Sequence, residues 1–592
     1  MMSLDQTPIN QLITDNIDTW TSTVKTKATT GRGSSKKREL YGVKKLRELI
    51  LELAVRGKLV PQDPNDEPAS VLVELADKAK ERLAEQKIIR KQKPLALIDN
   101  EQMSFILPKN WTYHRLGSLG LVGSSSRVQK KDWTDNGVPF YRAREIVKLS
   151  KNGFVENELF ISEELFSQLS QSGIIPEEND IMFTGVGTIG VPHVVKAQER
   201  FYFKDASVLI FKNIAGVNAD YLSMYMRSPL WNRDIHEDSM GTTVHTLTIA
   251  RANNVVTPFP PIKEQDRIVA KVDELMTLCD QLEQQTEASM EAHQVLVTKL
   301  LDTLTNSTDA DELMQNWARI SEHFDTLFTT EASIDQLKQT ILQLAVMGKL
   351  VPQDPTDEPA AKLLELIAEE KAQLIKDKKI KKQKALPPIA DDEKPFELPN
   401  GWEWCRLGSA CKKLTDGSHN PPPNHEGGFP MLSCKEIYDG RIDFSLASRF
   451  VDQDGFDKEN KRTAIKAGDV LLNIVASIGR SAIVPEKFPP FVLQRNVAVL
   501  DSEISSEYLT EFLMSPMALN YYDKNAKGTA QKVIYLGKLS EMLVPVPPQC
   551  EQDRIVKQLR EMMDLCSKLK LWITNAQVSQ VKLTEAIVEH AV

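Results

Sequence analysis

Long blocks of this chain occur twice, 291 residues apart. Residues 46–61 read LRELILELAVRGKLVP, and residues 337–352 read LKQTILQLAVMGKLVP. The match continues, with QDP at 62–64 and 353–355 and DEPA at 66–69 and 357–360. A duplication of this length constrains the chain to fold as two copies of one unit.

Shorter repeated blocks frame a long, much less similar stretch in each copy. Before the stretch, Leu107-Pro108, Trp111 and Arg115-Leu116-Gly117 return as Leu398-Pro399, Trp402 and Arg406-Leu407-Gly408. After it, Glu264-Gln265-Asp266-Arg267-Ile268-Val269 returns as Glu551-Gln552-Asp553-Arg554-Ile555-Val556, now 287 residues apart. These blocks divide the chain into five segments, which are 1–105, 106–262, 263–396, 397–549 and 550–592. Each copy therefore combines repeated segments with one variable region.

The repeated segments have the periodicity of amphipathic helices. Leu46, Ile50 and Leu53 share one face of a helix predicted over 43–57, which Gly57 and the prolines after it should end. A second helix is predicted to run from Asp66-Glu67-Pro68 to Pro94. The second copy predicts helices at 335–348 and 359–384.

The helices that follow the variable regions each carry a heptad seam. The seam positions, spaced 4, 3, 4 and 3 residues apart, are Ile268, Val272, Leu275, Cys279 and Leu282 in the first copy and Ile555, Leu559, Met562, Cys566 and Leu569 in the second. Two such seams in one chain predict that the helices pair with each other. A helix of ~40 residues spans about 60 Å, close to two turns of B-DNA.

The variable regions, 106–262 and 397–549, have a different composition. They are rich in glycine, proline and asparagine and contain short apolar runs such as VPFYRA, DIMFTG and NVAVL. Runs of this length with turn residues between them predict strands. We expect two mixed α/β domains within an α+β chain.

The hydrophobic and charged fractions, 41% and 26%, are those of an ordinary soluble protein, and we expect the chain in the cytoplasm. No apolar run approaches the ~18 residues of a membrane span, and the first residues lack the pattern of a secretory signal. Six cysteines in 592 residues, none spaced as CxxC, predict neither a disulfide framework nor a metal site. The net charge of −9 argues against a general coat for nucleic acid, but a specific reader needs only local positive charge.

A search for catalytic motifs finds no self-contained set. Residues 185–190 (GVGTIG) match a dinucleotide fingerprint, but Pro192 prevents the helix that must follow, so a tight loop between strands is the better interpretation. Asn420-Pro421-Pro422-Pro423 resembles the Asn-Pro-Pro-aromatic motif of DNA amino-methyltransferases, but proline replaces the aromatic residue that would stack on a base. There is no phosphate loop and no HExxH. We predict no catalytic residue, no metal and no cofactor bound by this chain.

Polar loops in the variable regions offer the side chains that read DNA. Arginine and lysine pair with guanine and phosphate, and asparagine and glutamine pair with adenine. The candidates are Arg127, Lys130, Lys131, Arg142, Arg144, Thr184, Gly185, Gly187, Thr188, Gly241, Thr242, Thr243 and His245 in the first region, and Ser418, His419, Asn420, Lys435, Asn473, Ser477, Arg480, Arg495, Gly528, Thr529, Gln531 and Lys532 in the second.

The order and spacing of these blocks resemble the specificity subunits of type I restriction-modification systems. Each variable region opens near LPxxWxxxRLG and closes at PPxxEQDRIV, and the LAVxGKLVPQDPxDEPA blocks look most like the IB subclass. The resemblance implies two target-recognition domains, each reading half of a bipartite DNA site. It also implies an antiparallel coiled coil that fixes the gap between the halves.

The resemblance further implies partners that carry the chemistry. Two modification subunits would methylate adenine with AdoMet, and restriction subunits would translocate and cleave DNA with ATP and Mg. The specificity chain itself would be non-catalytic, in agreement with the motif search. Two other hypotheses stay open: a fused nuclease or methyltransferase with unrecognised motifs, and a tandem adaptor that binds proteins and never DNA.

Overall fold

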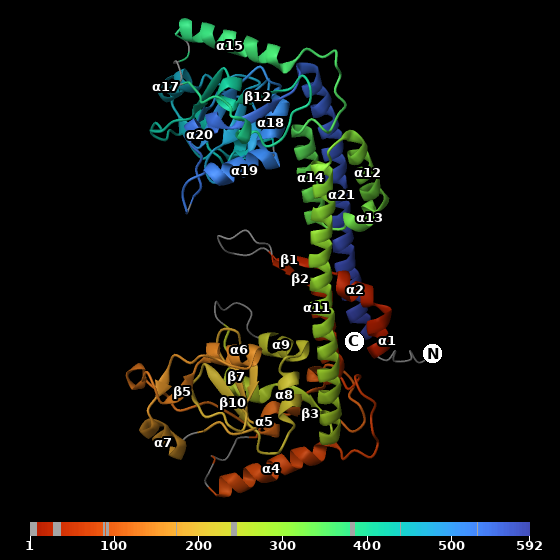
Figure 1. Cartoon of the computed structure of the whole chain (residues 1–592). Coiled ribbons are helices and arrows are strands. Elements are labelled where there is room, and N and C mark those ends of the chain that lie inside the picture. Colours follow the sequence, from red (N-terminus) through yellow and green to blue (C-terminus); the bar gives the residue numbers. More distant parts are fainter. Residues whose placement is uncertain are drawn as a thin grey trace. The chain divides into compact units, whose positions relative to one another are not determined.

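The chain forms two compact units (Figure 1), seen in a computed structural model. The structure describes residues 9–27, 37–86, 89, 94–172, 174–237, 245–378, 380, 385–438, 440–529 and 531–592. Unit 1 consists of Met1–Ala288 with Gln577–Val592, and unit 2 consists of Ser289–Ala576. Each unit holds one variable domain, and both long helices contribute residues to both units.

The predicted helices of the repeat are confirmed, with shorter second helices than expected. In unit 1 they are α3 (Tyr41–Val55) and α4 (Ala69–Glu85), and in unit 2 they are α14 (Glu331–Val346) and α15 (Ala360–Lys376). The long helices are α11 (Ile262–Asn306) and α21 (Gln549–Ala591), of 45 and 43 residues. Their lengths agree with the ~40 residues expected from the sequence.

In unit 2, helix α14 lies between the end of α11 and the beginning of α21. Gln336 donates to the hydroxyl of Thr298 on α11 at 2.9 Å, and Lys349, just beyond α14, donates to the carbonyl of Thr305 at 3.0 Å. These pairs show that α14 and α11 run in the same direction. Lys570 of α21 instead contacts Asp335 at 2.7 Å, and Lys338 contacts Ser567 at 3.1 Å. Within unit 2, α21 is therefore antiparallel to both.

Unit 1 repeats this arrangement with the roles of the long helices exchanged. Arg47 of α3 binds Asp280 and Glu283 of α11 at 2.7 and 2.6 Å. At the start of α3, Tyr41 donates to Glu585 at 2.7 Å, and beyond its end Lys58 donates to the carbonyl of Val592 at 2.5 Å. Lys58 and Lys349 are the matching lysines of the two GKLVP blocks, and each binds carbonyls where a long helix ends.

Residues of both heptad seams are buried, and the pairing of the two seams with each other stays a prediction. Ile555, Leu559 and Cys566 share one hydrophobic core with residues of α14, and the seam of α11 belongs to unit 1, where that helix packs beside α3. A heptad seam shows that a helix buries a stripe, but the stripe does not name the partner. The first helix of each repeat is therefore the central element that both long helices cover.

The repeat also reaches further toward the N-terminus than the sequence suggested. Helices α1 (Ile9–Asp15) and α2 (Ile17–Ser22) precede α3, as α12 (Ala310–Glu322) and α13 (Phe324–Leu327) precede α14. Ile13 and Ile320 are both buried at matching positions. Unit 1 adds strands β1 (Lys25–Lys27) and β2 (Lys37–Glu39), which pair as an antiparallel two-stranded sheet. This insertion shifts the offset between copies and hid the match.

The variable domain of unit 1 is built on three small sheets. Its strands pair in the orders β4 (Leu121–Gly123), β10 (Val208–Lys212), β7 (Ile181–Thr184), β8 (Pro192–Val194); β6 (Phe160–Ile161), β5 (Val138–Tyr141), β9 (Tyr202–Phe203); and β11 (Val256–Phe259), β3 (Thr112–Arg115). The helices are α5 (Leu116–Leu119), α6 (Ala143–Asn152), α7 (Glu163–Ser172), α8 (Ala219–Tyr225), α9 (Pro229–His236) and α10 (Ile249–Asn254). The mixed α/β prediction is confirmed for this domain.

The variable domain of unit 2 has the same plan. Its strands pair in the orders β13 (Lys413–Asp416), β21 (Val497–Asp501), β18 (Val470–Asn473), β19 (Ser481–Ile483); β17 (Phe450–Val451), β14 (Phe429–Leu432), β20 (Val492–Leu493); and β12 (Glu403–Arg406), β22 (Leu543–Val546), with a short pair β15 (Ile437–Tyr438), β16 (Arg441–Ile442). The helices are α16 (Leu407–Ala410), α17 (Gln453–Thr463), α18 (Ser506–Leu513), α19 (Pro516–Asn525) and α20 (Leu536–Glu541). Two dissimilar sequences thus specify one fold.

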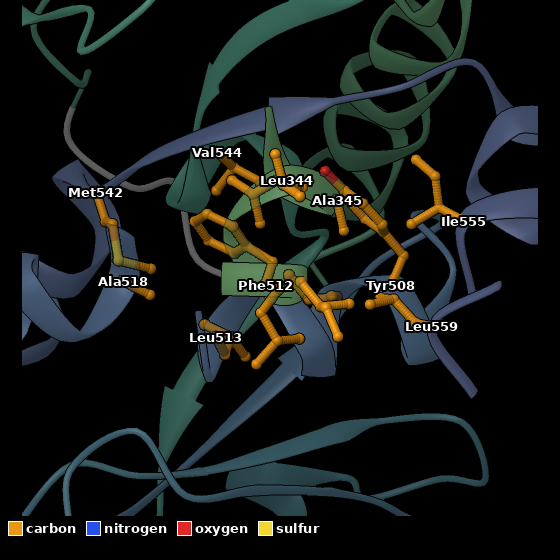
Figure 2. Packing of buried hydrophobic residues seen from close by; sticks show 14 of the residues in the cluster. Leu344, Ala345, Tyr508, Phe512, Leu513, Ala518, Met542, Val544, Ile555 and Leu559 are labelled. Atoms are coloured by element: carbon orange, nitrogen blue, oxygen red, sulfur yellow. The ribbon is translucent and has the colours of Figure 1, made fainter. Parts of the chain in front are cut away.

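The core of unit 2 joins the variable domain to the helices. Figure 2 shows Leu344 of α14, Phe512 of α18, Val544 of β22 and Ile555 of α21 packed together. Burial of several large apolar side chains at about 1.5–3 kcal/mol each makes this a stable attachment. Among the residues that the structure describes, no helix is long and apolar enough to cross a membrane.

Candidate nucleic-acid interface

The repeated blocks form an interlock between the helices and the variable domain. In unit 2, Gly348 has φ +69°, and a Cβ there would lie 2.5 Å from Cγ of Pro399 and 3.0 Å from the ring of Trp402. In unit 1, Gly57 has φ +68° and the same two distances to Pro108 and Trp111. The GKLVP turn and the LPxxW block are therefore kept because they touch each other.

The EQDR block provides the polar part of the interlock. Glu551 accepts from Nε1 of Trp402 at 3.0 Å and from Nε2 of Gln353 at 3.1 Å. Arg554 binds the carboxylate of Asp357. Burial raises the pKa of Glu551, although the Gln353 and Trp402 hydrogen bonds act against the rise. This glutamate therefore links α21 to both earlier blocks.

Unit 1 repeats two of these polar contacts. Gln62 donates to Glu264 at 2.7 Å, and Arg267 binds Asp66 at 2.6 Å. Gln265 accepts from the backbone N–H of Asn218, the residue before α8, at 3.0 Å. Gln552 accepts from the backbone N–H of Ser505, the residue before α18, at 2.8 Å. All of these side chains bond within their own unit, so they are not candidates for contact with DNA.

The arginine of the RLG block holds the linker that enters each domain. Arg115 donates to the carbonyls of Ala96 and Leu97 at 2.7 and 2.8 Å, and to the carbonyl of Asn254 at 2.6 Å. Arg406 makes the matching set of contacts in unit 2. Both guanidinium groups are buried, so neither is a candidate for DNA contact.

In the first variable domain, a buried glutamate organises the arginine loop before α6. Glu145 accepts from the backbone N–H of Arg142 at 2.9 Å and from the guanidinium groups of Arg142 and Arg144. Burial would raise the pKa of Glu145, but the two arginines hold it below its usual value. Arg144 also binds Glu158, and its side chain stays 48% exposed. Arg144 is therefore positioned and available.

The loop between β7 and β8 is a tight connection, as the sequence predicted. The backbone N–H of Gly187 donates to the carbonyl of His245 at 3.2 Å, and that of Leu247 donates to Gly185 at 2.8 Å. These bonds place loop 184–190 beside the segment that begins at His245. Thr184 is fully buried and supports the loop from within. The predicted contacts Gly241, Thr242 and Thr243 lie outside the described residues.

In the second variable domain, Glu436 takes the place of Glu145. It accepts from the backbone N–H and the hydroxyl of Ser433, both at 2.7 Å. Asn473 donates to the carbonyls of Cys434 and Ile437 at 3.0 Å and is fully buried. Asn473 therefore fixes the shape of the loop that carries Lys435, and Lys435 itself is exposed.

Backbone hydrogen bonds join the predicted loops of this domain into one surface. Ser418 bonds to Leu493 at 2.7 Å, and Gln494 bonds to Leu432 at 2.8 Å. Ile474 bonds to Asn496 at 3.0 Å, and Ala476 bonds to Lys532 at 2.9 Å. The loops around residues 418, 433, 475, 495 and 532 are thus neighbours although they are spread over more than a hundred residues of sequence.

Most predicted DNA-contacting residues are accessible at these loops. The exposed ones are Arg127, Lys130, Lys131, Arg144, Gly187, Thr188, His419, Asn420, Lys435, Arg480, Arg495, Gly528, Thr529, Gln531 and Lys532. Arg142, His245 and Ser477 are half-buried, and Thr184, Gly185, Ser418 and Asn473 are buried. The buried four can support a loop but present no side chain to a ligand in this structure.

Three residues of the second domain that the sequence analysis did not select join this surface. Asp416, at the end of β13, binds Arg462 and His419, and Glu459 accepts from the hydroxyl of Ser418 at 2.9 Å. Arg462 and Glu459 lie on α17, more than 40 residues from the loop they hold. No periodicity or motif connects positions so far apart, so only the fold reveals the cluster.

The described residues contain no group of three or more side chains suited to holding a metal ion. The neighbouring cysteines of the RLG region, Cys405 and Cys411, are buried and unpaired. Burial raises the pKa of the Cys411 thiol to about 12 and that of Cys405 to about 11, so both remain protonated and act as small apolar residues.

Comparison with known proteins decides the family. The model of the type I restriction modification DNA specificity domain matches residues 108–292 and 399–577, which is once in each copy. The chain belongs to this family. The type I restriction enzyme EcoAI specificity subunit of Escherichia coli is 40% identical over 610 residues, with 99% of this chain and 100% of that relative aligned. The EcoEI specificity subunit of the same organism is 36% identical, with 98% and 99% aligned.

Solved structures of this family align along most of the chain at low sequence identity. The HsdS subunit from Thermoanaerobacter tengcongensis is 18% identical, with a TM-score of 0.37 over 82% of this chain and 98% of that one. A chain from a structural study of assembly and conformational transition in the type I restriction-modification system is also 18% identical, with a TM-score of 0.42 at the same coverage.

Proposed function

We propose that each variable domain of this specificity subunit reads one half of a bipartite DNA site. The observation that carries the proposal is the contrast within each copy: the repeated residues form the interlock, and the residues that differ line one surface of loops. In the first domain that surface presents Arg144, and in the second it presents Lys435 and Arg480. Arginine and lysine suit guanine edges and phosphates.

The helices supply the reason for two copies. Because the interlock and the central helix recur in both units, the chain offers two equivalent surfaces to a partner that is present twice. We propose that two modification subunits dock on the repeated helices, and that restriction subunits join them in the cytoplasm. AdoMet, ATP and Mg would be used by those partners, and this chain would recognise DNA without catalysing a reaction.

The experiment that tests the proposal is to co-express the chain with its modification subunit and map adenine methylation across a genome by single-molecule sequencing. We expect methylation confined to one split motif. A hybrid in which residues 106–262 come from another subunit of the family should change one half of the motif and keep the other. A complex that forms but methylates no defined motif would contradict the DNA-reading role.

The alternative of a protein-binding adaptor predicts a different result. The adaptor would hold its partners together and show no preference for a DNA sequence. Binding that falls steeply with salt and distinguishes the mapped motif from a scrambled duplex would exclude it, because release of counterions from phosphates gives a log–log salt slope of about −0.9 per contact.

A further inference from the structure

An acid-centred cluster stands on the loop surface of the second variable domain. Asp416 is 6% exposed and accepts from Nε2 of His419 at 2.8 Å through one oxygen and from a terminal nitrogen of Arg462 through the other. Asp416 therefore binds two donors, His419 and Arg462, from different parts of the fold. His419 lies on the loop after β13, and Arg462 lies in the last turn of α17.

The cluster is continuous with the predicted DNA surface. Ser418 lies between Asp416 and His419 in the sequence. It donates its backbone N–H to the carbonyl of Leu493 and its hydroxyl to Glu459 of α17. Residue 494 in turn bonds to Leu432, which precedes the Lys435 loop. The loop and α17 are thus fixed against the same segments that carry Lys435 and Arg495.

Most N–H groups of the Arg462 guanidinium remain available to another ligand. A guanidinium has five N–H groups, and the contact with Asp416 is the one ion pair that the structure records for Arg462 among the described residues. Its side chain is 41% exposed, and the side chain of His419 is 54% exposed. Lys458 and Lys461 are exposed on the same helix. A fixed arginine with free N–H groups and nearby cations suits an anion that carries several acceptor oxygens.

The first variable domain lacks this feature. Its matching helix α7 reads EELFSQLSQS and contains two glutamates and no lysine or arginine. The loop that follows β4 reads SSSRVQ and contains no carboxylate. The cluster therefore belongs to one half of the molecule and is not a requirement of the shared fold.

We propose that Arg462, oriented by Asp416, binds a phosphate of the DNA backbone at the half-site read by the second domain. This assignment rests on the proposed function and adds a contact that positions DNA without reading its sequence. Asp416 is a positioning residue, because it acts through Arg462 and is itself buried. The second half-site then has a backbone contact that the matching helix of the first domain, α7, has no arginine or lysine to make.

The role of Asp416 has a consequence with an unexpected sign. Removing a carboxylate from a DNA-binding surface reduces repulsion and, by charge alone, strengthens binding. If Asp416 instead holds Arg462 in place, Asp416→Asn should weaken binding although the protein becomes less acidic. Charge and positioning thus predict opposite changes for one substitution.

The test uses the full chain in complex with its modification subunits and a fluorescent duplex that carries both mapped half-sites. For Arg462→Ala we expect affinity about tenfold lower, as for loss of one charge-assisted hydrogen bond, and a log–log salt slope smaller by about 0.9. Lys394→Ala is the matched control, because Lys394 is an exposed lysine that pairs with Asp391 and lies outside both the repeated helices and the candidate DNA loops. It should change neither quantity.

Two further variants and a second duplex separate the possible failures. Arg462→Lys should retain part of the salt slope, and Asp416→Asn should weaken binding without lowering the melting temperature of the complex by more than a few degrees. On a duplex with a scrambled second half-site, Arg462→Ala should lose the same factor as on the intact site. An unchanged slope in Arg462→Ala, with wild-type discrimination intact, would overturn the phosphate contact alone. Equal affinity of the wild type for the intact and the scrambled duplex would overturn the proposed function.

Discussion

The interlock and the loop surface of the variable domains differ in how much the two units share. At the interlock, Gly57 and Gly348 make the same contacts to proline and tryptophan, and the φ angles agree within a degree. At the loop surface, Arg142 and Arg144 stand where the second domain has Ser433 and Lys435. The contrast shows that the two copies share the attachment of the domain and differ at its loop surface.

One matching pair of residues at the loop surface is the same in both units. Glu145 and Glu436 occupy matching positions, and both are buried and accept from a backbone N–H at the start of their loop, at 2.9 and 2.7 Å. The acceptor is constant, but its side-chain donors are arginines in one domain and a serine in the other. A fixed acid can therefore orient different donors, which lets the surface vary without loss of local order.

The largest loss of stability is expected when a glycine of the interlock is replaced by alanine. Gly348→Ala places a Cβ 2.5 Å from Pro399 at a residue with positive φ. A non-glycine residue in this region costs about 1–2 kcal/mol, and overpacking adds about 1–3 kcal/mol, so we expect a loss near 3 kcal/mol. Gly57→Ala should cost unit 1 a similar amount. Hydrogen exchange measured separately on peptides of each unit checks this.

The control for that pair is Gly153→Ala. Gly153 has φ +74° but nothing within 4 Å of the added Cβ, so it should lose only the cost of the backbone conformation. If Gly348→Ala and Gly153→Ala destabilise their units equally, the contact with Pro399 contributes nothing and the interlock is not a packing constraint.

A smaller loss, about 2 kcal/mol, is expected for Glu551→Ala. The substitution leaves Nε1 of Trp402 buried without an acceptor, and an unsatisfied buried donor costs about 1–3 kcal/mol. Chemical denaturation of the complex, followed by tryptophan fluorescence, measures the effect. Adding Trp402→Phe, which removes the donor, should recover part of the loss; no recovery would show that the Trp402 hydrogen bond is not its source.

At the loop surface the effects should be specific to one half-site. Arg144→Ala should reduce discrimination in the first half of the motif by about 1–3 kcal/mol and leave the second half unchanged. Lys435→Ala should do the reverse. Binding to duplexes mismatched in one half at a time measures both. If either variant weakens all duplexes by the same factor, that residue contacts phosphate and does not read a base.

The sequence predicts the parts of the molecule that are local or repeated. The helix that ends at Gly57, the tight loop at 184–190 and the strands of both variable domains follow from periodicity and turn residues. The repeated EQDR block marked the end of each domain, but its sequence does not reveal that Glu551 meets Trp402, 149 residues away. Residue identity shows what a side chain can bond to, and the fold decides with what.

The rest depended on contacts between distant segments. The helices that contain Ile13 and Ile320 were not recognised as a repeat, because β1 and β2 alter the spacing between the copies. The seam of α21 predicts the correct buried face, but it does not reveal that α14 also packs against that face. Asp416 was overlooked because its significance comes from Arg462, which only the packing of α17 brings near.

The smallest expected effect compares two buried aspartates at matching positions of the two variable domains. Asp180 accepts from Nζ of Lys212 at 2.6 Å and from the N–H of Asn213 at 3.0 Å, whereas one oxygen of Asp469 has no hydrogen-bond partner. Burial raises the pKa of Asp469, against the attraction of Lys413. Burial therefore favours the protonated form of Asp469 in the folded state.

The sign of the pH dependence follows from that raised pKa. The stability that Asp469 contributes is complete below the unfolded pKa of about 3.9 and is lost as pH rises through the higher folded value. Asp469→Asn cannot lose a proton, so its stability relative to the wild type should improve between pH 4 and pH 7, by about 1 kcal/mol or less. Burial also raises the pKa of Asp180, against its bonds to Lys212 and Asn213. Asp180→Asn should nevertheless be destabilising at pH 7, because Lys212 loses its buried ionic partner. Melting temperatures measured across this range check both, and a gain for Asp469→Asn that is the same at pH 4 and pH 7 would show that the carboxylate does not titrate there.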